Sequence, residues 1–163
     1  NDSKKLTEKK REKLYDIILN NFNVAVGIAS VEEIDKLNIL NADFLAMRRA
    51  LKDLEKFHEA NKDYIVLVDG NLKIKEYEGK QLPVVKGDAK SLSIAAASII
   101  AKVTRDRIMK DLGLKYPDYD FEKNKGYGTK KHVEAIKTKG VLKNVHRKVF
   151  LRKINNTWIK KVL

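Results

Sequence analysis

The sequence predicts an α/β protein, and three observations lead to that class. Two short apolar runs, residues 64–68 and 83–85, are each followed within three residues by an aspartate. Unbroken runs of this length are typical of strands covered on both faces inside an α/β sheet. The segments around them carry apolar residues at helical spacing. Open α/β sheets bind ligands at the carboxyl ends of their strands, so Asp69 and Asp88 mark the expected functional edge.

The segment before the first run is predicted to be largely helical. Thr7 can cap a first helix, and residues 24–29 form a short apolar stretch that indicates a strand. Ser30 and Glu33 stand three residues apart, which is the spacing of a capping box, and predict a helix through about Leu37. A longer helix follows Asn41. Its expected buried stripe shares helical spacing and comprises Leu40, Phe44, Met47, Leu51 and Leu54.

The segment after the first run contains an excursion and further helices. Residues 72–80 form a hairpin or an excursion, and Ser91 caps a helix to about Leu112. The small residues at 94–98 would let this helix pack close to the sheet and keep Asp88 near Asp69, although alanines are also simply good helix formers. Residues 116–119 form a turn, and a helix from Thr129 ends at Gly140.

Composition limits the class of protein. The 163 residues suit one domain with a sizeable core, and 43% of them are hydrophobic. The absence of cysteine excludes disulfides, thiol catalysis and cysteine-ligated metals, and it suits a reducing, cytoplasmic location. No apolar run reaches the roughly 18–20 residues of a membrane helix, so no membrane association is expected.

The net charge of +13 is unevenly distributed. Residues 1–122 hold 22 basic and 21 acidic side chains, whereas residues 123–163 hold 13 basic and one acidic. A basic block can be an ordinary solvated surface. Concentrated in a short ordered region, it favours a polyanion-binding face, with nucleic acid foremost and an acidic membrane surface or protein as alternatives. Residues 1–122 are therefore predicted to form a core, and residues 123–163 a basic substrate-binding region.

Two carboxylates at neighbouring strand ends suggest a metal site. Asp69 and Asp88 would supply hard oxygen ligands that suit Mg²⁺ or Mn²⁺. Beside a nucleic-acid face, such a site supports metal-assisted phosphodiester hydrolysis. An aspartate at a strand end is also commonly a turn or cap residue, and sites of this kind usually gather three or four carboxylates.

Each of the other candidate residues allows a functional and a purely structural interpretation. Tyr127 lies between glycines beside Lys125 and can stack on a base or sugar, or it can be an ordinary loop tyrosine. The Ser3-Lys4-Lys5 segment can grip phosphate, or it can be an exposed stretch ahead of a helix. His146 can shuttle protons, but beside Arg147 and Lys148 it is more typical of a surface residue.

Six sequence blocks, in order, together resemble the ribonuclease HII family, the type 2 ribonucleases H. The similarity covers nearly the whole chain through about Phe150. The blocks are residues 1–6, residues 33–40, Val68-Asp69-Gly70-Asn71, Val84-Val85-Lys86-Gly87-Asp88, residues 96–106 and Lys125-Gly126-Tyr127-Gly128-Thr129.

The resemblance implies a fold, an activity and partners. It implies a ribonuclease H-like mixed sheet flanked by helices, with a C-terminal helical region that helps to clamp the substrate. It implies endonucleolytic, Mg²⁺- or Mn²⁺-dependent cutting of RNA in RNA–DNA hybrids and at single ribonucleotides in duplex DNA. The products would carry 3′-hydroxyl and 5′-phosphate ends, and the biological setting would be ribonucleotide excision repair and DNA replication. The intact protein is expected to be a monomer.

The resemblance also implies roles for individual residues. Asp69 and Asp88 resemble two of four acidic catalytic metal ligands, and Tyr127 resembles a tyrosine that stacks at the RNA–DNA junction. The residues expected to contact nucleic acid are Ser3, Lys4, Lys5, Lys86, Ser98, Lys102, Lys125 and Tyr127.

The chain departs from the family pattern at two places. The family begins with two strands that carry an Asp-Glu pair and a Gly-Arg-Gly turn, and no stretch here matches them. Val149 stands where the family usually has serine. The first two strands are therefore expected to be absent from this chain, and the 163 residues alone are expected to be inactive. The alternatives are a non-catalytic nucleic-acid-binding fragment, which would tolerate a chelator, and an acid-box phosphatase or another polynucleotidyl transferase.

Overall fold

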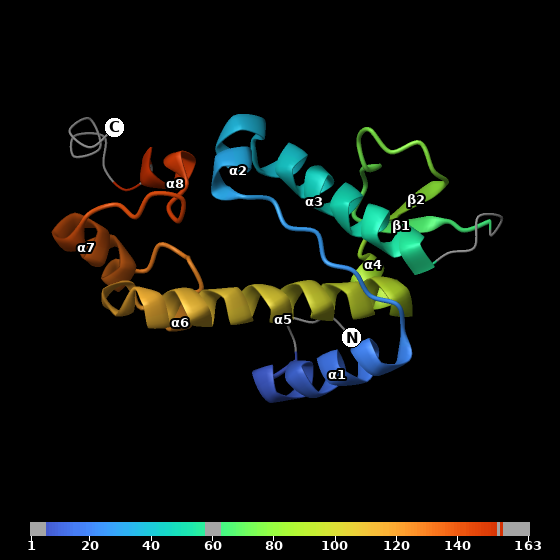
Figure 1. Ribbon diagram of the computed structural model, residues 1–163, viewed down its shortest axis with the longest axis horizontal. Helices are drawn as coiled ribbons and strands as arrows, with labels where there is room; N and C mark the ends of the chain where they lie inside the picture. The colour runs from blue at the N-terminus through green and yellow to red at the C-terminus, as the bar shows by residue number, and fades with distance from the viewer. Residues whose placement is uncertain (1–5, 58–62, 153, 155–163) are drawn as a thin grey trace. The chain divides into compact units, whose positions relative to one another are not determined.

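The computed structural model describes residues 6–57, 63–152 and 154 (Figure 1). Its described part contains α-helices and a small parallel sheet, so the α/β class is confirmed. The elements in chain order are α1 (Glu8–Asn21), α2 (Val31–Leu37), α3 (Ile39–Leu54), η2 (Glu55–Phe57), β1 (Val66–Asp69), β2 (Gln81–Val84), α4 (Gly87–Lys90), α5 (Leu92–Lys115), η3 (Pro117–Tyr119), α6 (Phe121–Asn124), α7 (Lys130–Lys139) and α8 (Lys148–Arg152).

The chain divides into two compact units. The first comprises Asn1–Ile28 and Asp43–Thr104, and the second comprises Ala29–Ala42 and Arg105–Leu163. The first unit contains the two strands, and the second contains η3 and the helices that follow it. The sequence-based boundary near residue 122 concerns function, and it stays a prediction.

The sheet of the first unit is two-stranded and parallel. Val66 pairs with Gln81, and the register continues to the pair of Asp69 with Val84. Val68 is 4% exposed and packs with Phe44 of α3. The expectation that these strands are covered on both faces is wrong, because Leu67 and Leu82 are 36% and 50% exposed. Successive side chains of a strand point to opposite faces, and one of the two faces packs on the apolar cluster with α3.

The excursion between the strands is confirmed, and it is anchored by one side chain. The Oε1 atom of Gln81 accepts a hydrogen bond from the Ile74 N–H at 2.6 Å, and its Nε2 donates to the Ile74 carbonyl at 3.2 Å. A further bond runs from Nε2 to the carbonyl of Tyr77 at 3.1 Å. Ile74 is thereby held in the apolar cluster with Phe44 and Val68, where it is 4% exposed.

The predicted strand at residues 24–29 is wrong. This segment is extended coil, and in the described part of the chain no strand pairs with it. Gly27 lies against the backbone of α3, where a Cβ atom would collide with Ala46. Nη1 of Arg49 donates to the Ile28 carbonyl at 2.6 Å. The segment that the apolar pattern had assigned to a sheet thus packs on a helix at Gly27, and an arginine satisfies its Ile28 carbonyl.

The helix starts predicted at Thr7, Ser30 and Ser91 are confirmed. The helix predicted after Asn41 begins earlier, at Ile39, and the expectation that Leu40 is buried is wrong, because it is 47% exposed. The Oγ atom of Ser30 accepts from the Glu33 N–H at 3.2 Å, and the Glu33 carboxylate accepts from the Ser30 N–H at 2.8 Å, which completes the capping box. Thr7 caps α1, and Ser91 accepts the first bonds of α5. Ile18 of α1 packs with the apolar face of α5, which supplies Ile99, Ile100 and Val103.

The second unit has its own core. Phe121 and Ile136 are 1% and 0% exposed, and the cluster also holds Met109, Tyr119, Ala135 and Leu151. The predicted turn at residues 116–119 is η3, and α7 begins at its Thr129 cap and ends before Gly140 as expected. The carboxylate of Asp35 accepts the Lys148 N–H at 2.9 Å, which satisfies a backbone donor at the start of α8.

Candidate functional site

Asp69 ends β1, as the sequence predicted. Its Oδ1 atom accepts a hydrogen bond from the Gly87 N–H at 2.8 Å, across a sequence separation of 18 residues. The chain turns directly after it, with Gly70 at a φ of 108° and its N–H bonded to the Val84 carbonyl at 3.0 Å. The carboxylate is exposed and lies beside the backbone that carries Asp88.

Asp88 does not end a strand, which corrects the second strand-end assignment. The strand stops at Val84, and Asp88 is half-buried on the four-residue helix α4. Lys86 enables this turn because it adopts a left-handed conformation with a φ of 56°. The side chain of Ile94 would meet a Cβ atom at Gly87 at 2.5 Å, and Asp69 Oδ1 would meet it at 3.2 Å. A glycine therefore lets α4 approach the carboxylate.

The donor chemistry of this pair fits a hard cation. Each carboxylate oxygen has two lone pairs, so the oxygen of Asp69 that accepts from Gly87 can still bind another group. Mg²⁺ retains waters and often binds through one or two carboxylates together with substrate phosphate oxygens. Within residues 6–57, 63–152 and 154, no group of three or more His, Asp or Glu side chains is arranged for a metal. Asp69 and Asp88 are thus two candidate ligands, and no third such side chain joins them in the described part of the chain.

The predicted basic and polar contacts fall into three groups. Lys86 is exposed in the turn that links the two aspartates, so the structure brings it together with them. Ser98 and Lys102 are half-buried and four residues apart on α5, which places them on one helix face. Both belong to the first unit, and both engage in interactions with other residues. The Ser3-Lys4-Lys5 segment lies outside the described residues.

Tyr127 is exposed on a loop whose backbone is well anchored. Its side chain is 70% exposed. Its N–H donates to the Asn124 carbonyl at 2.8 Å, and its carbonyl accepts from the Thr129 N–H at 2.9 Å. Lys125 precedes it in a left-handed conformation, and the Lys125 carbonyl accepts from Nη2 of Arg105 at 3.2 Å. The loop therefore holds an aromatic ring in solvent, which is the arrangement that stacking requires.

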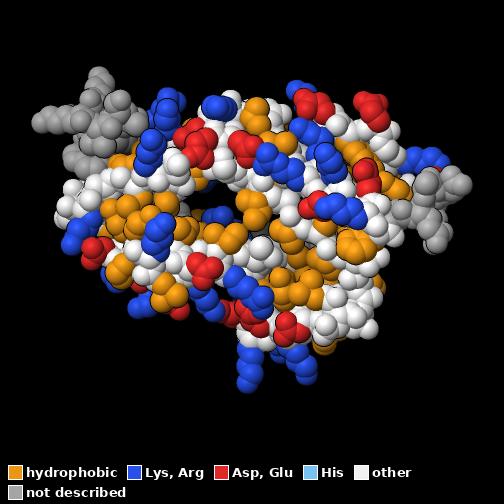
Figure 2. Space-filling view, in the orientation of Figure 1, with side chains coloured by type: hydrophobic (Ala, Val, Ile, Leu, Met, Phe, Trp, Pro, Cys, Tyr) orange, Lys and Arg blue, Asp and Glu red, His pale blue; other side chains and the backbone are white. Residues whose placement is uncertain are grey.

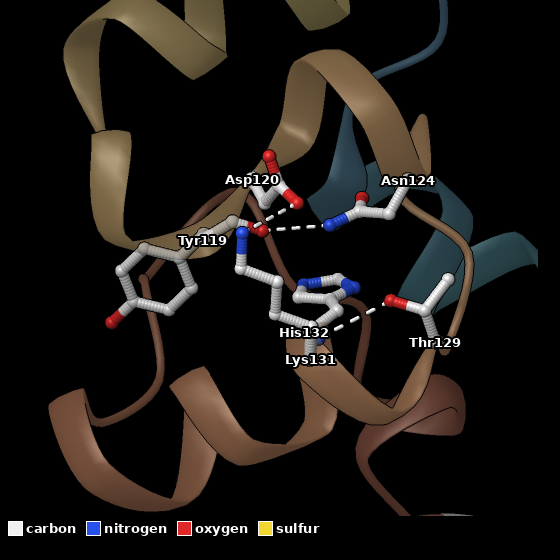
Figure 3. Close-up of polar contacts among 6 residues, drawn as sticks. All are labelled: Tyr119, Asp120, Asn124, Thr129, Lys131 and His132. Carbon is white, nitrogen blue, oxygen red and sulfur yellow. Dashed lines mark hydrogen bonds and ion pairs between the residues drawn. The ribbon is translucent and has the colours of Figure 1, made fainter.

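The supports of this loop come from neighbouring helices, as Figure 3 shows. Asn124 is buried, its Nδ2 donates to the Tyr119 carbonyl at 2.7 Å, and its Oδ1 accepts from Gly126 at 2.8 Å. Thr129 Oγ1 accepts the His132 N–H at 3.2 Å (Figure 3). Lys131 forms an ion pair with Asp120 at 3.0 Å (Figure 3).

Two histidines form a buried pair beside this loop. The expectation that His146 is a surface residue is wrong, because it is 6% exposed. Burial and the neighbouring His132 lower the pKa of His146 to about 4. The sequence analysis missed His132, which is 1% exposed and whose Nδ1–H donates to the Tyr127 carbonyl at 2.9 Å. Its burial could have been predicted from its position on the apolar face of α7, three residues before Ala135 and four before Ile136.

Basic side chains surround α7 and its flanking loops. Figure 2 shows Lys and Arg side chains interspersed with acidic ones on the face in view. Lys131 and Lys139 each pair with an aspartate, at 3.0 Å and 3.3 Å. The other exposed basic residues described in the C-terminal region are Lys123, Lys130, Lys137, Lys143, Lys148 and Arg152. This charge provides non-specific attraction for a polyanion.

The described part of the chain contains no helix that is both long and apolar enough to span a bilayer.

Comparison with known proteins identifies the family. The ribonuclease HII family model matches residues 1–153. A ribonuclease HII of Fusobacterium nucleatum is 80% identical over 157 residues, which cover 96% of this chain and 73% of that protein. The ribonucleases HII of Caldanaerobacter subterraneus and Clostridioides difficile are each 50% identical over 155 residues, or 94% of this chain. The chain spans 61% and 58% of the length of these two relatives.

These matches confirm the resemblance that the six sequence blocks indicated. They also confirm the enzyme class at the level of the family, because the matched relatives are named as ribonucleases. With a family model over residues 1–153 and a relative that is 80% identical, the chain belongs to the ribonuclease HII family.

Proposed function

We propose that this chain provides metal-binding and substrate-binding residues of an endoribonuclease. The enzyme would cut RNA in RNA–DNA hybrids and at single ribonucleotides in duplex DNA. The products would be 3′-hydroxyl and 5′-phosphate ends. The family match over residues 1–153 supports this function. The observation that carries it is the hydrogen bond of Asp69 to the Gly87 N–H at 2.8 Å, because this bond brings the end of β1 next to the turn that bears Asp88.

Asp69 and Asp88 are proposed to hold Mg²⁺ or Mn²⁺ together with further ligands. A bound divalent ion would supply charge neutralisation at the scissile phosphate and a more acidic water. The contribution of the chain itself is to orient the carboxylates. Gly87 fixes one oxygen of Asp69, and the left-handed turn at Lys86 directs the backbone that carries Asp88. The Lys86 side chain is then available for a neighbouring phosphate.

The C-terminal region, residues 123–163, is proposed to hold the substrate. The Tyr127 ring is 70% exposed and would stack on a nucleotide at the RNA–DNA junction. Lys125 and the basic residues of region 123–163 would contact the phosphate backbone, and Ser98 and Lys102 of α5 are proposed to contribute from the first unit. The Ser3-Lys4-Lys5 segment keeps its proposed role in phosphate contact.

The test is cleavage of a duplex that contains one ribonucleotide, assayed with and without Mg²⁺ or Mn²⁺. In the full-length protein, Asp69→Asn should lower the rate by on the order of 10³-fold or more, because a neutral amide loses the charge that a cation requires. Asp53→Asn is the matched control, since Asp53 is exposed on α3 and pairs with Lys56 in an (i, i+3) surface bridge. Cutting that persists in excess chelator, or that survives Asp69→Asn, would refute the metal role.

The same assay addresses the activity of the 163 residues by themselves. The prediction that this chain alone is inactive is tested by comparing it with a full-length relative on the same duplex. Metal-dependent cutting by the 163-residue chain would overturn that prediction. Chelator-insensitive binding without cutting would support the alternative of a nucleic-acid-binding fragment.

A cytoplasmic location, a monomeric state and a role in ribonucleotide excision repair and DNA replication are also proposed. The chain contains no cysteine, which suits a reducing compartment. Sedimentation of the full-length protein with and without duplex would test the monomeric state.

A further inference from the structure

Two buried imidazoles lie outside the groups used so far. His132 belongs to α7, and His146 belongs to the turn before α8. They are 1% and 6% exposed, and their ring centroids are 5.3 Å apart. Phe121 lies edge-on to His132 at 5.2 Å, and Phe150 stacks on His132 at 5.5 Å. Burying a polar ring among apolar side chains costs free energy unless its nitrogens form hydrogen bonds.

The hydrogen bonds of this pair allow one set of proton positions. The Leu142 N–H donates to Nδ1 of His146 at 3.0 Å, so this nitrogen carries no proton. The proton of His146 is therefore on Nε2, which lies 3.2 Å from Nε2 of His132. His132 must accept there, and its own proton is on Nδ1. That Nδ1–H donates to the Tyr127 carbonyl at 2.9 Å.

The result is a directed chain of three hydrogen bonds, here called the imidazole chain. It starts at the Leu142 N–H, passes through His146 and His132, and ends at the Tyr127 carbonyl. Protonation of either ring would place two donors face to face or remove an acceptor. The lowered pKa of His146, about 4, agrees with a neutral His146 ring at physiological pH.

The imidazole chain meets the Tyr127 loop at a second point. Gly128 lies against Phe150, where a Cβ atom would be 3.2 Å from Cε2. Phe150 in turn stacks on His132. Gly128 thus packs on Phe150, and Phe150 stacks on the imidazole of His132 that donates to the Tyr127 carbonyl. The Tyr127 side chain itself points away into solvent.

We propose that His132 and His146 are positioning residues for Tyr127, which fix the backbone of its loop so that the exposed ring is presented for nucleotide stacking. This inference rests on the proposed stacking role of Tyr127. The competing explanation is that both histidines only fill the aromatic core.

The first experiment measures the proton positions directly. Long-range ¹H–¹⁵N spectra of the ¹⁵N-labelled full-length protein at pH 7 should show His132 protonated on Nδ1 and His146 on Nε2. The Nδ1-protonated form is the rarer one for a free imidazole, so its presence at His132 reports the bond to Tyr127. A spectrum in which His132 is protonated on Nε2, or in which either ring is charged, would overturn the proposal.

Two variants of His132 separate positioning from packing. The amide of Asn reaches the place of Nδ1, so His132→Asn should keep the donor to the Tyr127 carbonyl and lose the partner His146. The longer Gln reaches the place of Nε2, so His132→Gln should keep His146 as partner and lose the bond to Tyr127. Both variants remove the same ring and should lower the Tm comparably.

Binding and loop order should nevertheless differ between these variants. His132→Gln should weaken binding of a ribonucleotide-containing duplex by about tenfold and broaden the Tyr127 amide signal, whereas His132→Asn should recover most of both. Equal loss in both variants, in proportion to the loss of Tm, would establish a packing role and overturn the proposal. Tyr127→Ala tests the underlying function separately. If Tyr127→Ala binds as tightly as wild type, stacking fails as a function, while the Tyr127 amide signal still decides whether the imidazole chain orders the loop.

Discussion

The Asp69 carboxylate and the Tyr127 loop are held in different ways. The Oδ1 atom of Asp69 accepts from the Gly87 N–H, which belongs to the turn between the four-residue strand β2 and the four-residue helix α4. The Tyr127 backbone has bonds to Asn124, Thr129 and His132, above a core that contains Phe121. Such support lowers the entropy lost when a ligand is bound. The carboxylates are proposed to gain order from a bound cation, whereas the backbone of Tyr127 is held by hydrogen bonds within the protein.

The largest effect on stability is expected where the Tyr127 loop takes its support. Phe121→Ala should lower the free energy of unfolding by about 3–5 kcal/mol, because Phe121 is 1% exposed and touches Tyr119 and both buried histidines. Phe57→Ala is the control, since Phe57 is 55% exposed and should change stability by less than about 1 kcal/mol. Urea denaturation measures both. Similar losses would show that the second core does not carry the loop.

The next effect is a dependence of stability on pH that comes from the buried His146. The folded pKa of His146 is lowered to about 4, so between that value and its ordinary value of 6.5 the unfolded chain binds a proton that the folded chain excludes. Stability should therefore fall as the pH decreases through this window, by on the order of 2–3 kcal/mol in total.

The variant His146→Gln isolates this contribution. It cannot titrate, so the difference between wild type and variant should change across pH 4 to 6.5 and stay constant above pH 7. Urea midpoints measured at several pH values provide the comparison. A difference that is independent of pH would mean that His146 is accessible to protons in the folded state.

A smaller effect on stability is expected at Gly87, whose N–H donates to the Asp69 carboxylate. Gly87→Ala places a Cβ atom 2.5 Å from Ile94 and 3.2 Å from Asp69 Oδ1, so it should cost about 1–3 kcal/mol and displace the carboxylate. Gly70→Ala is the matched control, because no atom lies within 4 Å of its added Cβ and the cost comes from a φ of 108° alone. Mn²⁺ titration, followed by paramagnetic broadening, should weaken for Gly87→Ala much more than for Gly70→Ala. Equal weakening would contradict a link between Gly87 and the metal ligand.

The smallest effect on stability should be at the exposed ring. Tyr127→Ala should change the free energy of unfolding by less than about 0.5 kcal/mol, because the side chain is 70% exposed. Its affinity for a ribonucleotide-containing duplex should fall about tenfold or more, and Tyr127→Phe should retain most of it because the stacking face is kept. Fluorescence anisotropy measures the affinity. A large loss of stability with unchanged affinity would reverse the contrast between the two regions.

Much of the local structure could be predicted from neighbouring residues. The capping box of Ser30 and Glu33, the Thr129 cap and the Gly140 stop each depend on contacts within three or four residues. The end of β1 at Asp69 followed in the same way from an apolar run next to turn residues.

The errors arose where distant residues decide the structure. The stretch at residues 24–29 has the apolar character of a strand, but the surface that meets it is the backbone of α3. His146 lies beside Arg147 and Lys148 in the sequence, yet its ring is buried against Phe121 and His132. Periodicity describes the character of a segment and not the surface that will cover it.

The sequence by itself determined the family, the basic C-terminal region and the two candidate carboxylates, because motifs, charge and strand ends are local properties. Only the tertiary structure decided how the groups are held. The bond of Asp69 to Gly87 spans 18 residues, and the contact of His132 with His146 spans 14. The direction of a hydrogen bond inside a core depends on which donors and acceptors the fold brings within about 3 Å, and no local pattern encodes that choice.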